Sequence, residues 1–349
     1  MTAIHILGEL KAGPWGGGNQ FLKALREYLR GCGAYAETLD VAQAVLANGH
    51  QWGPYLYEMF RAKRVNPNLV VLHRVDGPMA VVRGREDNRI LDDAIIRFNR
   101  HFADGTIFQS NWSRGLCLAG GMDANKRQTV LFNAPDPSLF HPSTVMRPTS
   151  GKVRIVSTSW SSNWRKGFDV FEYLDNHLDF SKYEFTFVGN SRISFRNVRH
   201  LPAIPSDVLA DELRAHDIFL QASQMEACSN SLIEAMNCGL VPVARNNSSH
   251  PEIVGDAGVL YEGVGDVLDA IEKAVSIRAD CLARLPGDHT LTRIGHAYLE
   301  FAADVSRRPV ARPTMAGFAA TWIAWKVTKY PGFAQKLTSF CRFDVNRLT

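Results

Sequence analysis

The chain has 349 residues, of which 46% are hydrophobic and 21% charged, and its formal net charge at pH 7 is +4. This length predicts two domains or three, and this composition argues against a disordered, collagen-like or low-complexity chain. The longest apolar runs are far shorter than the ~20 residues of a membrane-spanning helix, the first ten residues (MTAIHILGEL) lack the pattern of a signal peptide, and the six scattered cysteines have no zinc spacing, so we expect a cytoplasmic protein.

Short apolar runs alternate with helical patterns through the first half of the chain. A glycine-rich loop at 13–18 follows the first predicted strand. The predicted strands are 4–7, 42–47, 69–73, 106–109 and 129–132, and the predicted helices are 20–29, 55–64 and 90–102. Strands that alternate with helices indicate βαβ units and a parallel sheet.

A polar stretch at 133–151 contains four prolines and no periodicity, which predicts a linker. After it the alternation resumes, with predicted strands at 153–158, 184–189, 218–221, 240–244 and 259–261 and predicted helices at 168–178, 208–214, 231–237, 264–277 and 291–305. We therefore predict two Rossmann-like, doubly wound domains that face a cleft, with ligands at the carboxyl ends of the strands. The predicted boundaries are 1–145 and 146–310, followed by a basic, aromatic segment at 311–349.

The most informative pattern is a pair of glutamates, Glu226 and Glu234, that flank the start of a predicted helix. The polar run Ser229-Asn230-Ser231 occupies the helix start, where free N–H groups and the positive end of the helix dipole favour a phosphate. The two carboxylates could then accept hydrogen bonds from the hydroxyls of a sugar and a ribose. A purely structural alternative is a capping box in which Glu234 pairs with Ser231 and only closes the helix start.

The region around these glutamates resembles the Glu-x7-Glu signature of family 4 retaining glycosyltransferases, which use nucleotide sugars and have the GT-B fold. Further segments resemble the motifs of that family in the same order along residues 4–300: Gly17-Gly18-Asn-Gln-Phe, Gln109-Ser-Asn-Trp-Ser, Leu131-Phe-Asn-Ala-Pro-Asp, Ser157 to Asp169 and His250 to Gly258. The resemblance implies a donor site mainly on the second domain and an acceptor site mainly on the first.

The resemblance assigns the donor diphosphate to Lys166 and to the glycine loop Gly16-Gly17-Gly18, with Asn19 on the acceptor side. Glycines let a backbone approach a ligand closely, although a flexible surface turn would use them equally well. In the family a second cation, an arginine, stands several residues before the lysine, whereas this chain has Ser159 and Trp160 there. The neighbouring Arg165 is expected to point elsewhere.

His73 ends an apolar run and precedes a Gly-Pro turn, so we expect it to project into the cleft. The resemblance implies that it contacts the donor sugar near the reacting carbon and acts with Lys166 and Glu226 in catalysis; a structural histidine is the alternative. Asp76 is either an acceptor-side carboxylate or a turn cap, and His50 is a weaker cleft candidate.

No Asp-x-Asp pair occurs in the chain. In glycosyltransferases of the other common fold that pair holds a divalent metal on the diphosphate, so we expect no metal cofactor here, with a lysine and helix dipoles in its place. The resemblance also implies retention of anomeric configuration.

The last 45 residues carry eight basic and one acidic residue. Phe318, Trp322 and Trp325 fall on one face of a predicted helix. The resemblance implies a helix that packs back on the first domain, while residues 331–349 are candidates for contact with an anionic membrane surface. No motif indicates nucleic-acid binding.

The sequence thus predicts a retaining, metal-independent glycosyltransferase that moves a sugar from a nucleoside-diphosphate sugar to a glycan or lipid-linked glycan acceptor. Two alternatives stay open. One is a catalytically silent nucleotide-sugar-binding protein, which the absent arginine favours, and the other is a sugar-nucleotide epimerase of the same fold, for which the His73 region offers only Asp76 as a carboxylate.

Overall fold

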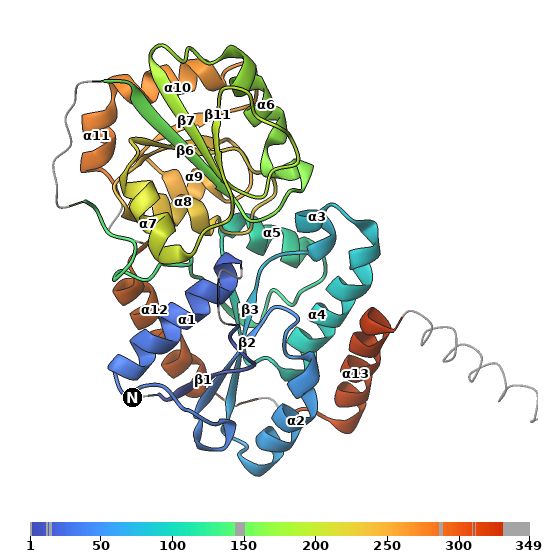
Figure 1. Ribbon diagram of the computed structural model, residues 1–349. Helices are drawn as coiled ribbons and strands as arrows, with labels where there is room; N and C mark the ends of the chain where they lie inside the picture. The colour runs from blue at the N-terminus through green and yellow to red at the C-terminus, as the bar shows by residue number, and fades with distance from the viewer. Residues whose placement is uncertain are drawn as a thin grey trace, which may run out of the picture.

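The computed structural model describes residues 2–330 apart from 12, 14–15, 144–150, 286–288, 309 and 311. It contains two α/β domains, one above the other in Figure 1. The predicted tail at 331–349 lies outside the described residues.

The first domain is built on a parallel sheet of five strands in the order β1-β2-β3-β4-β5. Helices pack on both faces, and the central strands β2 and β3 bury side chains on both sides. Its elements are β1 (Ile4–Ile6), α1 (Gly17–Gly31), η1 (Leu39–Val41), β2 (Ala44–Asn48), η2 (Gly53–Tyr55), α2 (Leu56–Val65), β3 (Val70–Val75), α3 (Met79–Arg83), η3 (Glu86–Asn88), α4 (Arg89–Phe102), β4 (Gly105–Phe108), α5 (Asn111–Ala119) and β5 (Arg127–Val130).

The second domain has a parallel sheet of six strands in the order β11-β10-β9-β6-β7-β8. Its elements are β6 (Val153–Ser159), η4 (Trp164–Lys166), α6 (Phe168–His177), β7 (Tyr183–Gly189), β8 (Arg199–Leu201), α7 (Ser206–Arg214), β9 (Ile218–Gln221), α8 (Asn230–Asn237), β10 (Val241–Arg245), α9 (His250–Val254), β11 (Val259–Tyr261), α10 (Val267–Ser276) and α11 (Arg278–Ala283). The strand order reverses between β6 and β9, which makes their carboxyl ends the expected place for a ligand.

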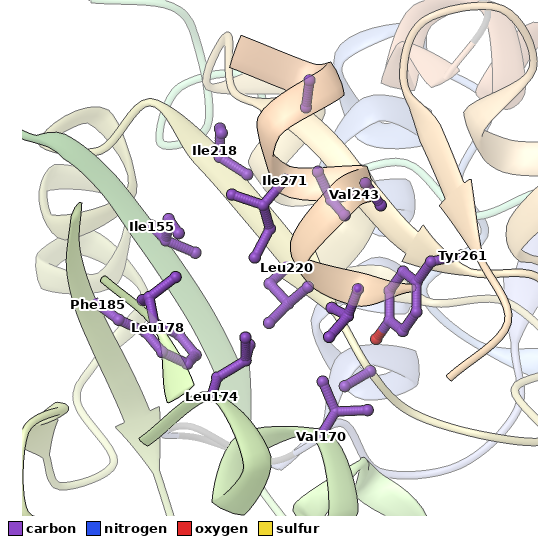
Figure 2. Packing of buried hydrophobic residues seen from close by; sticks show 14 of the residues in the cluster. Ile155, Val170, Leu174, Leu178, Phe185, Ile218, Leu220, Val243, Tyr261 and Ile271 are labelled. Carbon is purple, nitrogen blue, oxygen red and sulfur yellow. The ribbon is translucent and has the colours of Figure 1, made fainter. Parts of the chain in front are cut away.

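The core of the second domain is a layer of apolar side chains between sheet and helices. Figure 2 shows Leu174 of α6 and Ile271 of α10 beside Leu220 of β9, and all three are fully buried. Burial of a side chain of this size stabilises the fold by about 1.5–3 kcal/mol. This packing fixes the strands whose ends carry the predicted site.

Two C-terminal helices return to the first domain, whereas the sequence predicted this return only for the segment after residue 310. α12 (Leu291–Ser306) contributes Tyr298 and Phe301 to the core around β1 and α1, and α13 (Met315–Lys329) packs on α4 (Figure 1). The return starts at Leu291, so the predicted end of the second domain at residue 310 falls inside the part that packs on the first. The helical spacing of apolar residues indicates that one face of a helix is covered, but it does not show which of the two domains covers that face. In the described part of the chain, none of the helices combines the length and apolar character needed to cross a bilayer.

Candidate functional site

A cavity of about 310 Å³ lies between the two domains, at the carboxyl ends of β6 and β9. The structure brings most of the predicted donor residues to its wall: Gly16, Gly17, Lys166, Glu226, Ser229, Asn230, Ser231 and Glu234. Four predicted site residues are absent from that wall: Gly18, Asn19, His73 and Asp76.

Two helices begin at the cavity, one from each domain. α1 starts at Gly17 and α8 starts at Asn230, and neither start has a side-chain cap. The N–H groups of a first helical turn have no partner within the helix, and the dipole adds positive charge there. The cavity therefore presents two positively polarised helix ends to the same space, which suits an anion with more than one charged group.

The two helix starts lie so close because residue 17 is a glycine. A Cβ atom at Gly17 would come within 3.0 Å of the Asn230 side chain, closer than real Cβ atoms approach. At Gly18, by contrast, a Cβ atom would meet no atom within 4 Å. Because Gly17 has no side chain, the two domains can come close together at this point, in addition to the predicted close approach of a ligand.

The capping box proposed as an alternative for Glu234 is absent from the structure. The cap residue of α8 is Ser229, whose hydroxyl accepts a hydrogen bond from Gln221 Nε2 at 2.6 Å and lies 3.3 Å from the Ser231 hydroxyl. Ser231 sits inside the helix, too late to cap it. The side chain of Glu234 therefore does not close the helix start.

Glu234 is a carboxylic acid in a poorly hydrated wall of the cavity. Burial raises the pKa of Glu234 to about 7, and within the described residues its carboxylate makes no ion pair and no hydrogen bond. Such a group is costly to keep ionised without a partner. A half-buried acid that faces a cavity and has no partner among the described residues is typical of a ligand-binding position.

Glu226 and Lys166 form an ion pair across the cavity floor. Burial alone would raise the pKa of Glu226, but the Lys166 ammonium outweighs it and holds the pKa below its ordinary value. Met225, directly before Glu226, has a positive φ of 58°, an uncommon conformation for a residue with a side chain. A strained backbone of this kind is often found at functional sites.

Arg165 points away from the cavity floor, as expected from the sequence. Its Nη1 donates a hydrogen bond of 3.0 Å to the carbonyl oxygen of Val81 in the first domain. The cavity wall carries Ser159 and Trp160 where the related family places its arginine, and the Trp160 side chain is exposed.

The expectation that His73 projects into the cleft is wrong. β3 continues to Val75, so His73 lies inside the strand and is fully buried. Its Nε2 is 2.8 Å from the carbonyl oxygen of Gly49, its Nδ1 is 3.2 Å from Asn99 Nδ2, and burial lowers its pKa to about 4. The strand continues beyond the apolar run. Polar side chains can be buried in this last part of the strand because they find hydrogen-bond partners from distant parts of the chain.

Asp76 belongs to a polar network that sequence reasoning missed. The network is centred on the fully buried Arg74, whose guanidinium donates to Asn48 and Asn133 at 2.5 Å each and to Asp76 at 3.3 Å. Asn133 in turn donates to Asn230 at 2.9 Å, which ties the interior of the first domain to the start of α8. The sequence feature that could have revealed this network is an arginine next to the apolar residues of a predicted strand.

Asn19 fastens the loop that precedes α1. Its Oδ1 accepts a hydrogen bond from the backbone N–H of Lys11, and its Nδ2 donates to the carbonyl oxygen of the same residue, each at 3.0 Å. This pair of bonds ties Lys11 to the first turn of α1.

A second cavity, of about 570 Å³, lies on the first-domain side of the same loops. Its wall includes Arg165 and Met225, whose chain neighbours Lys166 and Glu226 line the first cavity. The rest of the wall comes from β3 and from the segments around α3, α4 and α5, and it combines apolar residues with the charged residues Glu86, Arg89, Asp92 and Asp93. The apolar residues are Val75, Pro78, Val81, Ile95, Ile96, Leu116, Cys117 and Met122. The segments 165–166 and 225–226 therefore separate the two cavities, and each contributes one residue to either wall.

Glu252 joins the domains at the other end of the interface. Its carboxylate accepts hydrogen bonds from the backbone N–H groups of Asn111 and Trp112 at 2.8 and 2.7 Å, and from the Asn111 side chain at 3.0 Å. A carboxylate of the second domain therefore caps the start of α5 in the first domain, where negative charge is favourable.

Comparison with known proteins now adds to this geometry. Residues 156–277 match the family model described as glycosyl transferases group 1. This segment is therefore similar to glycosyl transferases of that group. It contains Lys166, Glu226 and Glu234, three residues of the first cavity.

Two curated relatives carry similar sequences, and both belong to phosphatidylinositol N-acetylglucosaminyltransferases. A subunit of that enzyme from Arabidopsis thaliana is 29% identical over 200 residues, which cover 52% of this chain and 44% of that protein. The GPI3 subunit from Saccharomyces cerevisiae is 32% identical over 128 residues, which cover 36% of this chain and 27% of that protein. The chain thus spans less than half the length of these relatives.

Solved structures confirm the GT-B fold expected from the sequence. Anabaena Alr3699/HepE, solved in complex with UDP and glucose, has a TM-score of 0.66 at 13% identity and covers 87% of this chain and 100% of its own. Sucrose-phosphate synthase from Thermosynechococcus elongatus has a TM-score of 0.59 at 17% identity and covers 85% of this chain and 81% of its own. The segment that matches the family model therefore lies in the second domain of a two-domain fold.

Proposed function

We propose that the chain is a retaining, metal-independent glycosyltransferase that takes its sugar from a nucleoside-diphosphate sugar bound in the first cavity. One observation carries the proposal: two uncapped helix starts, a lysine and two glutamates with opposite pKa shifts meet around one space of about 310 Å³. Such an arrangement offers positive polarisation for a diphosphate and hydrogen-bond acceptors for hydroxyls.

The proposed donor is held in three parts. The diphosphate lies against the starts of α1 and α8 and takes the Lys166 ammonium, which turns from Glu226 to the phosphates. Glu226, released from that pair, accepts hydrogen bonds from hydroxyls of the transferred sugar. Glu234 accepts hydrogen bonds from the ribose hydroxyls, which supply the partners that its carboxylate lacks in the described part of the structure.

The proposed reaction breaks the bond between the anomeric carbon and the diphosphate oxygen and forms a bond from that carbon to an acceptor hydroxyl oxygen. On a front-face route the departing phosphate oxygen takes the proton of the acceptor hydroxyl, so no protein base is needed and configuration is retained. Negative charge grows on the diphosphate, and donors already in place stabilise the transition state most at that point. Lys166 and the two helix starts supply this stabilisation.

The acceptor is proposed to occupy the second cavity. The apolar part of its wall suits the lipid chain of an acceptor, while Arg165 and the carboxylates Glu86, Asp92 and Asp93 offer polar contacts, and the likeness to part of a phosphatidylinositol N-acetylglucosaminyltransferase supports a lipid-linked acceptor. Each additional buried methylene is worth about 0.8 kcal/mol, so KM for acceptors with alkyl chains is expected to fall about fourfold for each added carbon until the cavity is full.

The experiment that tests the donor site compares sugar release from nucleotide sugars by the wild type and by Lys166→Met. A charge-assisted hydrogen bond to phosphate is worth about 1.5–3 kcal/mol, so kcat/KM is expected to fall roughly 10- to 150-fold in the variant. The matched control is Lys182→Met, because Lys182 is an exposed lysine with an ion pair on the surface of the same domain.

A silent nucleotide-sugar-binding protein is the second candidate, favoured by the tryptophan that stands in place of the family arginine at the cavity wall. A transferase is expected to hydrolyse its donor slowly when no acceptor is present, whereas a silent protein binds donor without any turnover. Binding of a nucleotide sugar with no release of free sugar over hours would reject the enzymatic proposal. Conversion of the donor to its epimer would instead identify an epimerase.

A further inference from the structure

α13 is apolar on its outer face as well as on the face that packs on the protein. On the packed side Gly317, Thr321 and Ala324 are buried, and Phe318 and Trp325 pack against the core of the first domain. The exposed side carries Met315, Ala316, Ala319, Trp322 and Ile323, a spacing of i, i+1, i+4, i+7 and i+8 that forms one stripe along a helix. A helix that is apolar all round is normally covered on both sides.

Large side chains in this stripe are open to solvent. Met315 is 60% exposed, Trp322 37% and Ile323 36%, and Tyr330 just after the helix is 58% exposed. Single exposed apolar residues are common on protein surfaces, but a continuous stripe usually marks an interaction site. Figure 1 shows α13 on the outer side of the first domain, away from the second.

The charged side chains of α13 itself are all basic. α13 has no acidic residue over its 15 residues, and the Lys326 ammonium lies 5.2–5.4 Å from the ring centres of Trp322, Trp325 and Tyr330. Lys329 ends the helix. On the α2 side, the exposed Tyr57 contacts Phe318 edge-on, and exposed Arg64 and Glu58 lie on the same short helix.

The basic end of α13 lies beside the cleft side of the first domain. Trp325 packs so closely against Gly53 that a Cβ atom there would overlap its indole ring. Lys329 and Arg83 both act on His50, which follows the carboxyl end of β2. Arg83 ends α3, and Val81 and Gly84 of that same segment line the second cavity.

We propose that the outer face of α13, with Lys326 and Lys329, docks on the surface of a bilayer that contains anionic phospholipids. Tryptophan and tyrosine prefer the boundary between lipid and water, and lysines near the surface are attracted to anionic headgroups. The helix then lies in the plane of the interface with its apolar stripe towards the acyl chains. This inference goes beyond the proposed donor chemistry, and it brings the second cavity next to the membrane from which a lipid-linked acceptor would come.

A bilayer fits this face better than a second copy of the chain. Lysine is depleted in protein–protein interfaces, whereas two lysines flank the aromatic end of this stripe. Basic residues next to exposed aromatic side chains are the composition of an interfacial helix. The proposal therefore names a lipid surface as the occupant and leaves dimerisation as an outcome of the test.

The test is flotation of the full chain with vesicles of phosphatidylcholine containing about 30% phosphatidylglycerol, beside vesicles of phosphatidylcholine alone. Wild type is expected to float with the anionic vesicles and much less with the neutral ones. Each lysine near an anionic surface contributes about 1 kcal/mol, so Lys326→Gln with Lys329→Gln is expected to lower the partition coefficient roughly 25-fold. Trp322→Gln with Ile323→Gln is expected to lower it at least tenfold.

Val208→Gln is the matched control, because Val208 is an exposed apolar residue on α7 of the second domain and should leave flotation unchanged. Wild-type flotation in both α13 double variants would overturn the proposal and assign binding to another part of the chain. Failure of wild type to float would overturn it as well, and so would a dimer that dissociates in the Trp322 variant. Thermal melts with and without nucleotide on the same samples separate this outcome from failure of the donor site.

Discussion

Replacement of Glu234 by glutamine tests the electrostatics of the cavity, because it removes a charge and keeps the shape. Burial raises the pKa of Glu234 from 4.5 to about 7. A carboxyl whose pKa is raised in the folded state stabilises the fold only while it is protonated, and this stability is lost as pH rises from the unfolded pKa near 4.5 through about 7. Glu234→Gln is therefore expected to make the protein more stable than wild type at pH 8 and to change little at pH 5.

The magnitude follows from the size of the shift. At 1.36 kcal/mol for each pKa unit, the raised pKa corresponds to roughly 3 kcal/mol at pH 8. Glu234 is partly exposed to the cavity, where water screens the charge, so about 2 kcal/mol is a better expectation. For a domain of 150–250 residues this raises Tm by about 4–8 °C at pH 8.

The assay is thermal unfolding of both proteins, without nucleotide, at pH 5 and pH 8. Glu226→Gln is the matched control in the same cavity. The pKa of Glu226 is lowered because Lys166 outweighs its burial, so its ion pair stabilises the fold above the unfolded pKa and this stability is lost as pH falls. Glu226→Gln is expected to lower Tm at pH 8. Shifts of the same sign in both variants at pH 8, or a Glu234→Gln shift that does not depend on pH, would refute this reasoning.

Two further variants test how the domains meet. Gly17→Ala is expected to weaken nucleotide binding about tenfold or more in calorimetry, because its Cβ atom collides with Asn230. Adding Asn230→Gly to this variant should restore part of the affinity. Gly18→Ala should leave the affinity unchanged, because its Cβ atom would enter open space. An equal loss in Gly17→Ala and Gly18→Ala would contradict the steric argument. Glu252→Ala removes three hydrogen bonds between the domains and is expected to lower the free energy of unfolding by about 1–2 kcal/mol. It should also increase the radius of gyration in solution scattering. The control Glu262→Ala, whose hydrogen bond lies within the second domain, should leave that radius unchanged.

The sequence predicted well which residues of the second domain line the first cavity, because its signals there are local. The strand at Ile218–Gln221, the helix start near Ser229 and the glutamates on either side of it all follow from short-range patterns and turn chemistry. Parallel strands end at the same edge of a sheet, so residues placed at strand ends come together. This rule brought Lys166 to the same cavity as Glu226.

The first domain was harder to predict because its polar residues are satisfied over long distances. His73 and Arg74 looked like the end of a strand, yet both lie inside it and are buried. Their partners, Gly49, Asn99 and Asn133, come from other elements. Which polar side chains find a buried partner depends on the packed fold, and one sequence does not reveal it.

The capping-box alternative for Glu234 fails for a different reason. Ser231-x-x-Glu234 fits a capping box, but Ser229 earlier in the chain takes the cap position, so Glu234 is left for the cavity. Helix boundaries shift by one or two residues without any change in the apolar pattern. A shift of this size decides whether an acid caps a helix or faces a ligand.

The most direct test of the central claim is the thermal stability of wild type and Lys166→Met with a panel of nucleoside diphosphates and their sugars, with EDTA present. A ligand that binds only the folded state stabilises it by mass action and so raises Tm. At a hundredfold excess of ligand over Kd this stabilisation is about 2.7 kcal/mol. The account predicts a rise in Tm for one nucleotide class in the wild type and a much smaller rise in the variant at the same concentration. No rise with any nucleotide in folded wild-type protein, or an equal rise in both proteins, would contradict a donor site in this cavity.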